Sequence, residues 1–142
     1  MELIELERSI LNLLLAGDNA SLALLRTQLE AVTVASREFT GPAFFTQFEL
    51  SGHTEGVPGR PSLVIGDVYA KIKGLAYGAG FLLFVRDGVL SCLEGYCYGD
   101  DEWPKEQELF EAYYVHHEPP DSPMLKRCVV RDLSQLCKIA GL

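Results

Sequence analysis

The stretch 80–98, GFLLFVRDGVLSCLEGYCY, constrains the fold more than any other part of the chain. It contains two apolar runs of strand length joined by Asp87-Gly88, and Asp-Gly between such runs is a strong signal for a tight β-hairpin. A two-residue turn would place Leu83 opposite Cys92. Both faces of the hairpin would then be apolar, so we expect it to lie in the middle of a sheet that is covered on each side.

Helical spacing dominates the N-terminal part of the chain. Apolar side chains recur every three or four positions over residues 2–15 and again over 19–32, and Gly17 between them is a natural helix end. A connection this short predicts an antiparallel helical hairpin. Residues 131–140 show the same spacing and predict a short helix near the C-terminus.

The remaining segments have the patterns of strands. Alternating or β-branched residues occur over 32–40, 44–50 and 63–72. The segment 109–115 fits either a strand or a helix, and its alternation favours a strand. Together these elements predict a single α+β domain over residues 1–142. Its N-terminal helical hairpin would pack on one face of a mainly antiparallel sheet of five or six strands, with a short C-terminal helix.

Composition and charge exclude several classes of partner. The chain has 142 residues, of which 48% are apolar and 23% are charged, with a formal net charge of −8. These proportions are typical of a soluble globular domain. Nucleic acids and anionic membranes select basic surfaces, so the charge argues against both as partners. It favours high solubility or a basic protein partner.

The first residues, MELIELERS, are acidic where a secretory signal peptide is basic, which predicts a cytoplasmic protein. The four cysteines should then be reduced thiols. The one candidate metal set combines Cys92 and Cys97 with His116 and His117. An odd separation along a strand points the two cysteines to opposite faces, so we predict neither a metal nor another cofactor.

The sequence contains no catalytic signature that we can identify. Nucleophilic catalysis needs a nucleophile, a nearby base and a group that orients the base. There is no Gly-x-Ser-x-Gly segment, and the glycines of 74–80 are not followed by the Gly-Lys-Ser/Thr pattern of a phosphate loop. We therefore predict no catalytic residue. An enzyme would need His53, His116 or Glu94 to have neighbours that tune its pKa inside a cavity.

Acidic residues concentrate in one segment. Between residues 100 and 121 there are eight acidic residues and one basic residue, a local charge of −7. Just before it, Glu94 interrupts an apolar strand and is predicted to lie opposite Phe81 at the open end of the hairpin. In a purely structural role this carboxylate would lie at the rim of the sheet or bind a cation such as Arg37 or Lys71.

A functional interpretation joins Glu94 to the aromatic and acidic residues that follow it. Aromatic side chains beside charge are typical of protein-binding hot spots, whereas an acidic run alone is usually a solvated face. The candidate partner-binding residues are Glu94, Tyr96, Tyr98, Asp100, Asp101, Glu102 and Trp103.

The block 78–104, GAGFLLFVRDGVLSCLEGYCYGDDEWP, resembles a block of small bacterial proteins of unknown function. In that group a hydrophobic strand, a turn containing Asp-Gly and a Leu-Glu-Gly-aromatic segment run into an acidic Trp-Pro. The segments 37–41 and 66–68 resemble the group more weakly. The resemblance implies a bacterial source and a shared fold, and it carries no activity or catalytic residue.

Two classes of function follow from these observations. The sequence favours a non-enzymatic protein-binding module, and one role that fits is the neutralisation of a basic toxic enzyme, as immunity proteins and antitoxins do. The alternative is a small enzyme or small-ligand-binding protein with a pocket between sheet and helices. The second apolar face of the sheet would be covered by the C-terminal helix or by a second copy, which predicts a homodimer.

Overall fold

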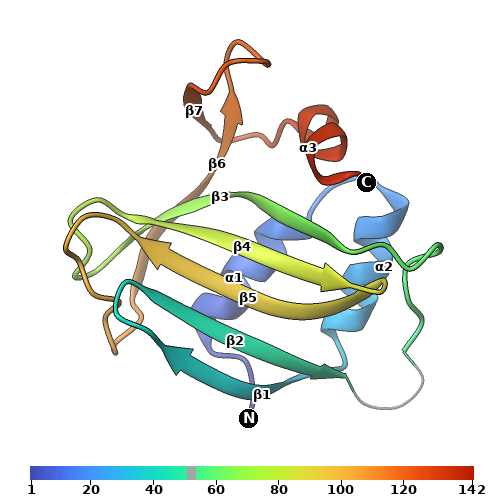
Figure 1. The fold of residues 1–142 in the computed structure, drawn as a ribbon, viewed down its shortest axis with the longest axis horizontal. Helices are drawn as coiled ribbons and strands as arrows, with labels where there is room; N and C mark the ends of the chain where they lie inside the picture. The colour runs from blue at the N-terminus through green and yellow to red at the C-terminus, as the bar shows by residue number, and fades with distance from the viewer. Residues whose placement is uncertain (51–53) are drawn as a thin grey trace.

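The structure, a computed structural model that describes residues 1–50 and 54–142, is built on one antiparallel sheet (Figure 1). Its seven strands lie in the order β1-β2-β5-β4-β3-β6-β7. The α+β class is confirmed, with seven strands where five or six were expected. The strands are β1 (Val32–Phe39), β2 (Ala43–Leu50), β3 (Leu63–Ile72), β4 (Ala79–Arg86), β5 (Val89–Cys97), β6 (Leu109–His117) and β7 (Leu125–Cys128).

The predicted hairpin forms the middle of the sheet as β4 and β5. Val85 pairs with Leu90, as a two-residue turn requires, but the register then shifts by one residue at a β-bulge. Leu83 therefore lies opposite Leu93, and the predicted pairing of Leu83 with Cys92 is wrong. A bulge inserts one unpaired residue, which exchanges the faces of all residues beyond it on that strand.

The hairpin turn is anchored to a helix. Asp87 and Gly88 have φ values of 51° and 77°, the left-handed conformation that this turn needs. The buried side chain of Gln28 donates to the Gly88 carbonyl at 3.0 Å and accepts from the Leu90 amide at 2.9 Å. It therefore fixes the turn against the end of α2 (Ala20–Leu29).

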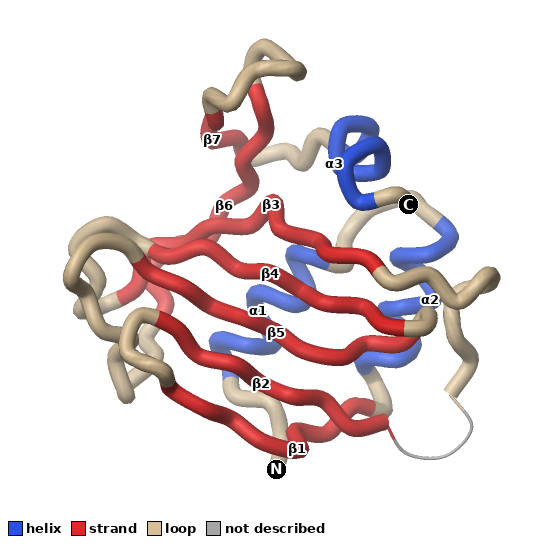
Figure 2. Tube along the Cα trace, viewed as in Figure 1, coloured by secondary structure: helices blue, strands red, loops and turns tan. Residues whose placement is uncertain are grey.

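The two N-terminal helices, α1 (Glu5–Leu14) and α2, lie on the same face of the sheet (Figure 2). Gly17 between them has φ of 123°, and Asn19 caps α2 by accepting from the Leu22 amide at 3.0 Å. None of the helices in the described part of the chain is long and apolar enough to span a membrane. The largest fully buried side chains between helices and sheet include Ile10, Leu11, Leu14, Leu22, Leu25, Phe44, Ile65, Phe81, Leu83 and Leu93.

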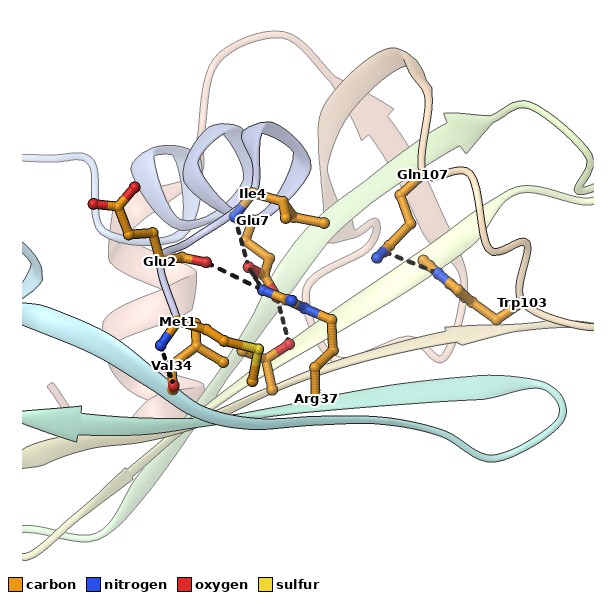
Figure 3. Close-up of polar contacts among 9 residues, drawn as sticks. Met1, Glu2, Ile4, Glu7, Val34, Arg37, Trp103 and Gln107 are labelled. Carbon is orange, nitrogen blue, oxygen red and sulfur yellow. Dashed lines mark hydrogen bonds and ion pairs between the residues drawn. The ribbon is translucent and has the colours of Figure 1, made fainter.

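Trp103 lies in the core, although the sequence suggested that it belongs to a partner-binding surface. Its side chain is only 5% exposed and packs 4.7 Å from the Phe44 ring and 6.0 Å from the Phe81 ring, measured between centroids. Its indole N–H donates to the Gln107 side chain at 3.0 Å (Figure 3), and its amide donates to the Gly41 carbonyl. These contacts hold the acidic segment against the end of the sheet.

The C-terminal part adds an element that was not predicted. The segment 109–115 is a strand, as favoured, and the unpredicted β7 pairs with it to form a hairpin that projects from the sheet (Figure 1). Beyond β7, α3 (Leu133–Ala140) packs against β3. Arg131 secures this region, because its guanidinium binds both oxygens of Asp67 at 2.7 Å and the Ala16 carbonyl.

Candidate functional site

One face of the sheet carries apolar and aromatic side chains that no helix covers among the described residues, except where α3 packs against β3 (Figure 2). Strand side chains alternate between faces, so those that point away from α1 and α2 form a second set. We call this surface the open face. Large contiguous apolar patches on folded proteins are typical of interaction sites. Its central residues are Phe45, Val64, Tyr69, Leu82, Phe84, Cys92, Glu94, Tyr96 and Tyr113.

Glu94 lies in the middle of the open face. Its neighbours on the adjacent strands are Phe45 of β2 and Leu82 of β4. The predicted position opposite Phe81, at the open end of the hairpin, is wrong because of the bulge in β5. Partial burial among these apolar neighbours raises the pKa of the Glu94 carboxyl above its ordinary value.

No basic side chain in the described part of the chain pairs with Glu94. The two cations considered from the sequence bind other carboxylates. Arg37 contacts Glu7 at 2.7 Å on the helix side of the sheet, and Lys71 lies 3.8 Å from Glu111. Glu94 is therefore a carboxylate without an internal counter-ion on an apolar surface.

Tyrosines form a row beside Glu94. The ring of Tyr96 lies across Gly80, where a Cβ atom would come within 2.3 Å of the tyrosine oxygen. Its hydroxyl lies 3.3 Å from that of Tyr69, and Tyr98 packs edge-on against it with a centroid distance of 5.7 Å. Burial, with the nearby Tyr69 hydroxyl, raises the pKa of Tyr98 to about 12. These contacts order three rings next to the carboxylate.

The predicted acidic residues extend this surface only in part. Asp100 and Glu102 are exposed and have no ion-pair partner among the described residues. The Asp101 carboxylate instead accepts from the Ala76 amide at 2.9 Å, which is a structural role. Trp103 is buried, so it is not available to a partner, and its assignment to the binding surface is corrected.

The candidate metal residues are not brought together. Cys92 lies on the open face, where burial and the nearby Glu94 raise the pKa of its thiol to about 11. Cys97 points to the opposite face and donates to the Pro42 carbonyl. Within residues 1–50 and 54–142, no group of three His, Cys, Asp or Glu side chains is arranged to hold a metal ion. His53 lies outside the described residues.

A groove of about 650 Å³ borders the open face between β3, the β6–β7 hairpin and α3. Tyr69 and Leu82 line it from the sheet, and His116 lines it from β6. Gln135 of α3 fixes its far wall by accepting from the His117 amide at 2.7 Å and donating to the same residue's carbonyl at 3.1 Å. Sequence reasoning missed this groove, because it depends on the β6–β7 pairing.

In comparisons with protein-family models, curated proteins and solved structures, nothing matches this chain. Its function is therefore inferred from its own residues.

Proposed function

We propose that this protein binds a basic protein through the open face, with a lysine or arginine of the partner placed on Glu94. The observation that carries the proposal is the position of that carboxylate, which lies between Phe45 and Leu82 without a counter-ion in the described part of the chain. A partner cation would relieve the cost of holding the charge on an apolar surface. The row of tyrosines would pack around its aliphatic stem.

Charge supports a basic partner. The whole chain carries −8, and the exposed Asp100 and Glu102 extend the negative surface beyond the tyrosine row. Complementary charge speeds encounter, while buried aromatic contacts slow dissociation. In this proposal the open face binds its partner without catalysis, as an immunity protein or antitoxin does. The proposed setting is a bacterial cytoplasm, which the resembling block and the four free cysteines favour.

The test compares parent protein with two matched variants, Glu94→Gln on the open face and Glu38→Gln on the edge strand β1. Partners are captured at low salt from the source cells, purified, and titrated against each variant. The captured protein should be basic, and Glu94→Gln should weaken its binding about 30-fold or more, because the partner's cation loses its counter-charge. Glu38→Gln should bind like the parent.

Two further variants separate the effect of charge on the association rate from the effect of aromatic packing on the dissociation rate. Neutralising Asp100 and Glu102 should slow association and reduce its salt dependence, whereas Tyr98→Ala should speed dissociation. An acidic partner, or equal binding by Glu94→Gln and Glu38→Gln, would contradict the proposal. So would a homodimer at micromolar concentration that Tyr98→Ala disrupts, because a second copy would then occupy the open face.

A small-molecule site is the second candidate function. The groove favours it, since about 650 Å³ is within the ~300–1,000 Å³ range of ligand pockets. His116, one of the three residues that the sequence named for an enzyme, lines this groove.

A further inference from the structure

Cys128 and His116 meet across the β6–β7 hairpin. Tyr114 pairs with Cys128 and His116 pairs with Lys126, so the thiol and the imidazole lie diagonally on one face of the two strands. The distance from Nδ1 of His116 to Sγ of Cys128 is 3.1 Å. This is hydrogen-bond contact between a nucleophile and a base, the pair that nucleophilic catalysis requires.

Glu118 supplies the third group of such a site. Its carboxylate lies 3.0 Å from Nε2 of His116 and 3.4 Å from the ammonium group of Lys126. The imidazole hydrogen bond and the nearby lysine hold the pKa of Glu118 below its usual value. An ionised Glu118 accepts a hydrogen bond from Nε2–H of His116, which leaves Nδ1 as an acceptor facing the thiol. Glu118 is therefore a positioning residue for His116.

The thiol is protonated at rest. Burial is the main cause that raises the pKa of Cys128, and the carboxylates of Asp67 and Asp132 add to it. Such a cysteine needs a base to remove its proton during attack, as a serine does. The contact with His116 provides that base within reach.

Space for a substrate borders His116, which contacts Cys128 from the wall of the groove. His116 also lines the groove, whose other walls include the aliphatic side chains of Leu82, Leu136 and Ile139. The amides of Val129 and Val130, directly after the cysteine, donate to no acceptor in the described part of the chain. A backbone amide that follows a nucleophile is well placed to bind an oxyanion.

We propose that Cys128, His116 and Glu118 form a thiol acyl-transfer site whose substrates are esters or thioesters with an apolar acyl group in the groove. The thiol proton passes to Nδ1 of His116 as Sγ bonds to the carbonyl carbon. The bond from that carbon to the leaving oxygen or sulfur then breaks, and the leaving group takes the proton from His116. The product is an acyl thioester on Cys128 and a free alcohol or thiol.

The experiment uses the full chain with p-nitrophenyl butyrate as the acyl donor. Release of p-nitrophenol is followed by absorbance, and the acylated cysteine is located by mass spectrometry of peptides. We expect one acyl group on Cys128. His116→Asn should slow its formation about 100-fold, the contribution of a general base. Cys137, which is also half-buried but has no histidine contact, is the matched control and should remain free.

Glu118→Gln tests the positioning role by a spectroscopic readout. The ¹⁵N signals of the His116 ring report which nitrogen carries the proton, and this variant should move them away from the Nε2–H form. Thermal unfolding of each variant shows whether the fold is kept, and a Cys137→Ser variant should acylate like the parent. Acylation of Cys128 no faster than Cys137, or an unchanged rate in a folded His116→Asn variant, would overturn the proposal.

Discussion

At the residue scale, Glu7 is the most deeply buried charge in the described part of the chain. Its side chain has no exposed surface, and it accepts from the Arg37 guanidinium at 2.7 and 2.9 Å, from the Thr46 hydroxyl and from the Ile4 amide (Figure 3). It therefore joins α1 to β1 and β2. A buried ion pair is costly to break from one side, because the remaining charge has no counter-ion.

We predict that Arg37→Met destabilises the protein by about 3 to 5 kcal/mol, since Glu7 remains buried without its cation. The double variant Glu7→Gln with Arg37→Met should recover at least half of that loss, because the uncharged amide still has an oxygen that accepts from the Ile4 amide and an NH2 group that can donate to the Thr46 hydroxyl. Urea unfolding of the parent and both variants measures this. A double variant no more stable than Arg37→Met would show that the charge is not the cause.

The candidate site could be predicted from the sequence only where a single residue is unusual for its local segment. Glu94 was proposed as a site residue because a carboxylate within an apolar strand is unusual in any fold. Trp103 was assigned to the surface because acidic neighbours suggest solvent, while its burial depends on Phe44 of a distant strand. The contact of His116 with Cys128 was missed because it comes from strand pairing and not from any local motif.

At the element scale, an aromatic ring of one strand packs over a glycine of the neighbouring strand on each face of the sheet. On the open face, Gly80 of β4 lies under Tyr96 of β5. On the helix face, Gly95 of β5 lies under the ring of Phe44 of β2, where a Cβ atom would come within 2.1 Å of that ring. Phe44 is fully buried, so its ring has no free space to move into.

We predict that Gly95→Ala destabilises the protein by about 1 to 3 kcal/mol through overpacking against Phe44. Adding Phe44→Leu to this variant should restore part of the loss, although Phe44→Leu alone is destabilising. Thermal unfolding measures all three. The control is Gly56→Ala, whose Cβ atom would have no neighbour nearer than 3.5 Å. Additive effects of the two core changes would contradict a direct clash.

Elements with strong local signals were predictable. The turn at Asp87-Gly88 has a sequence signature, and so does the helix cap at Asn19. The bulge in β5 has no such signature, and it exchanged the faces of Cys92 and Leu93 relative to the prediction. The strand β7 was not predicted because it is short, exposed and partly charged, as edge strands often are.

At the scale of the whole molecule, residues 129–142, which follow β7, are attached to the rest through few side-chain hydrogen bonds. Arg131 is the main one, since its guanidinium is only 6% exposed and reaches both Asp67 on β3 and the Ala16 carbonyl after α1. The exposed Val129 and Val130 before it make little contact. The position of α3, and with it one wall of the groove, therefore depends on Arg131 together with the contacts of Gln135 to His117.

We predict that Arg131→Ala increases amide hydrogen exchange in α3 by at least tenfold and leaves β1 and β2 unchanged, because local opening then costs less free energy. Hydrogen exchange with mass spectrometry measures each segment. Lys138→Ala, an exposed change on α3 itself, is the control and should exchange like the parent. Equal exchange in α3 of parent and Arg131→Ala would show that packing alone holds the helix.

The strand order, which no local pattern predicts, has a consequence for synthesis. β2 and β3 follow each other in the chain, yet the later hairpin of β4 and β5 lies between them. A ribosome that adds about 5 to 20 residues per second needs roughly 2 to 10 seconds to pass from the end of β2 to the end of β5. During that interval the edge of β2 that will face β5 has no partner strand. It can pair only after β5, which ends at Cys97, has been synthesised.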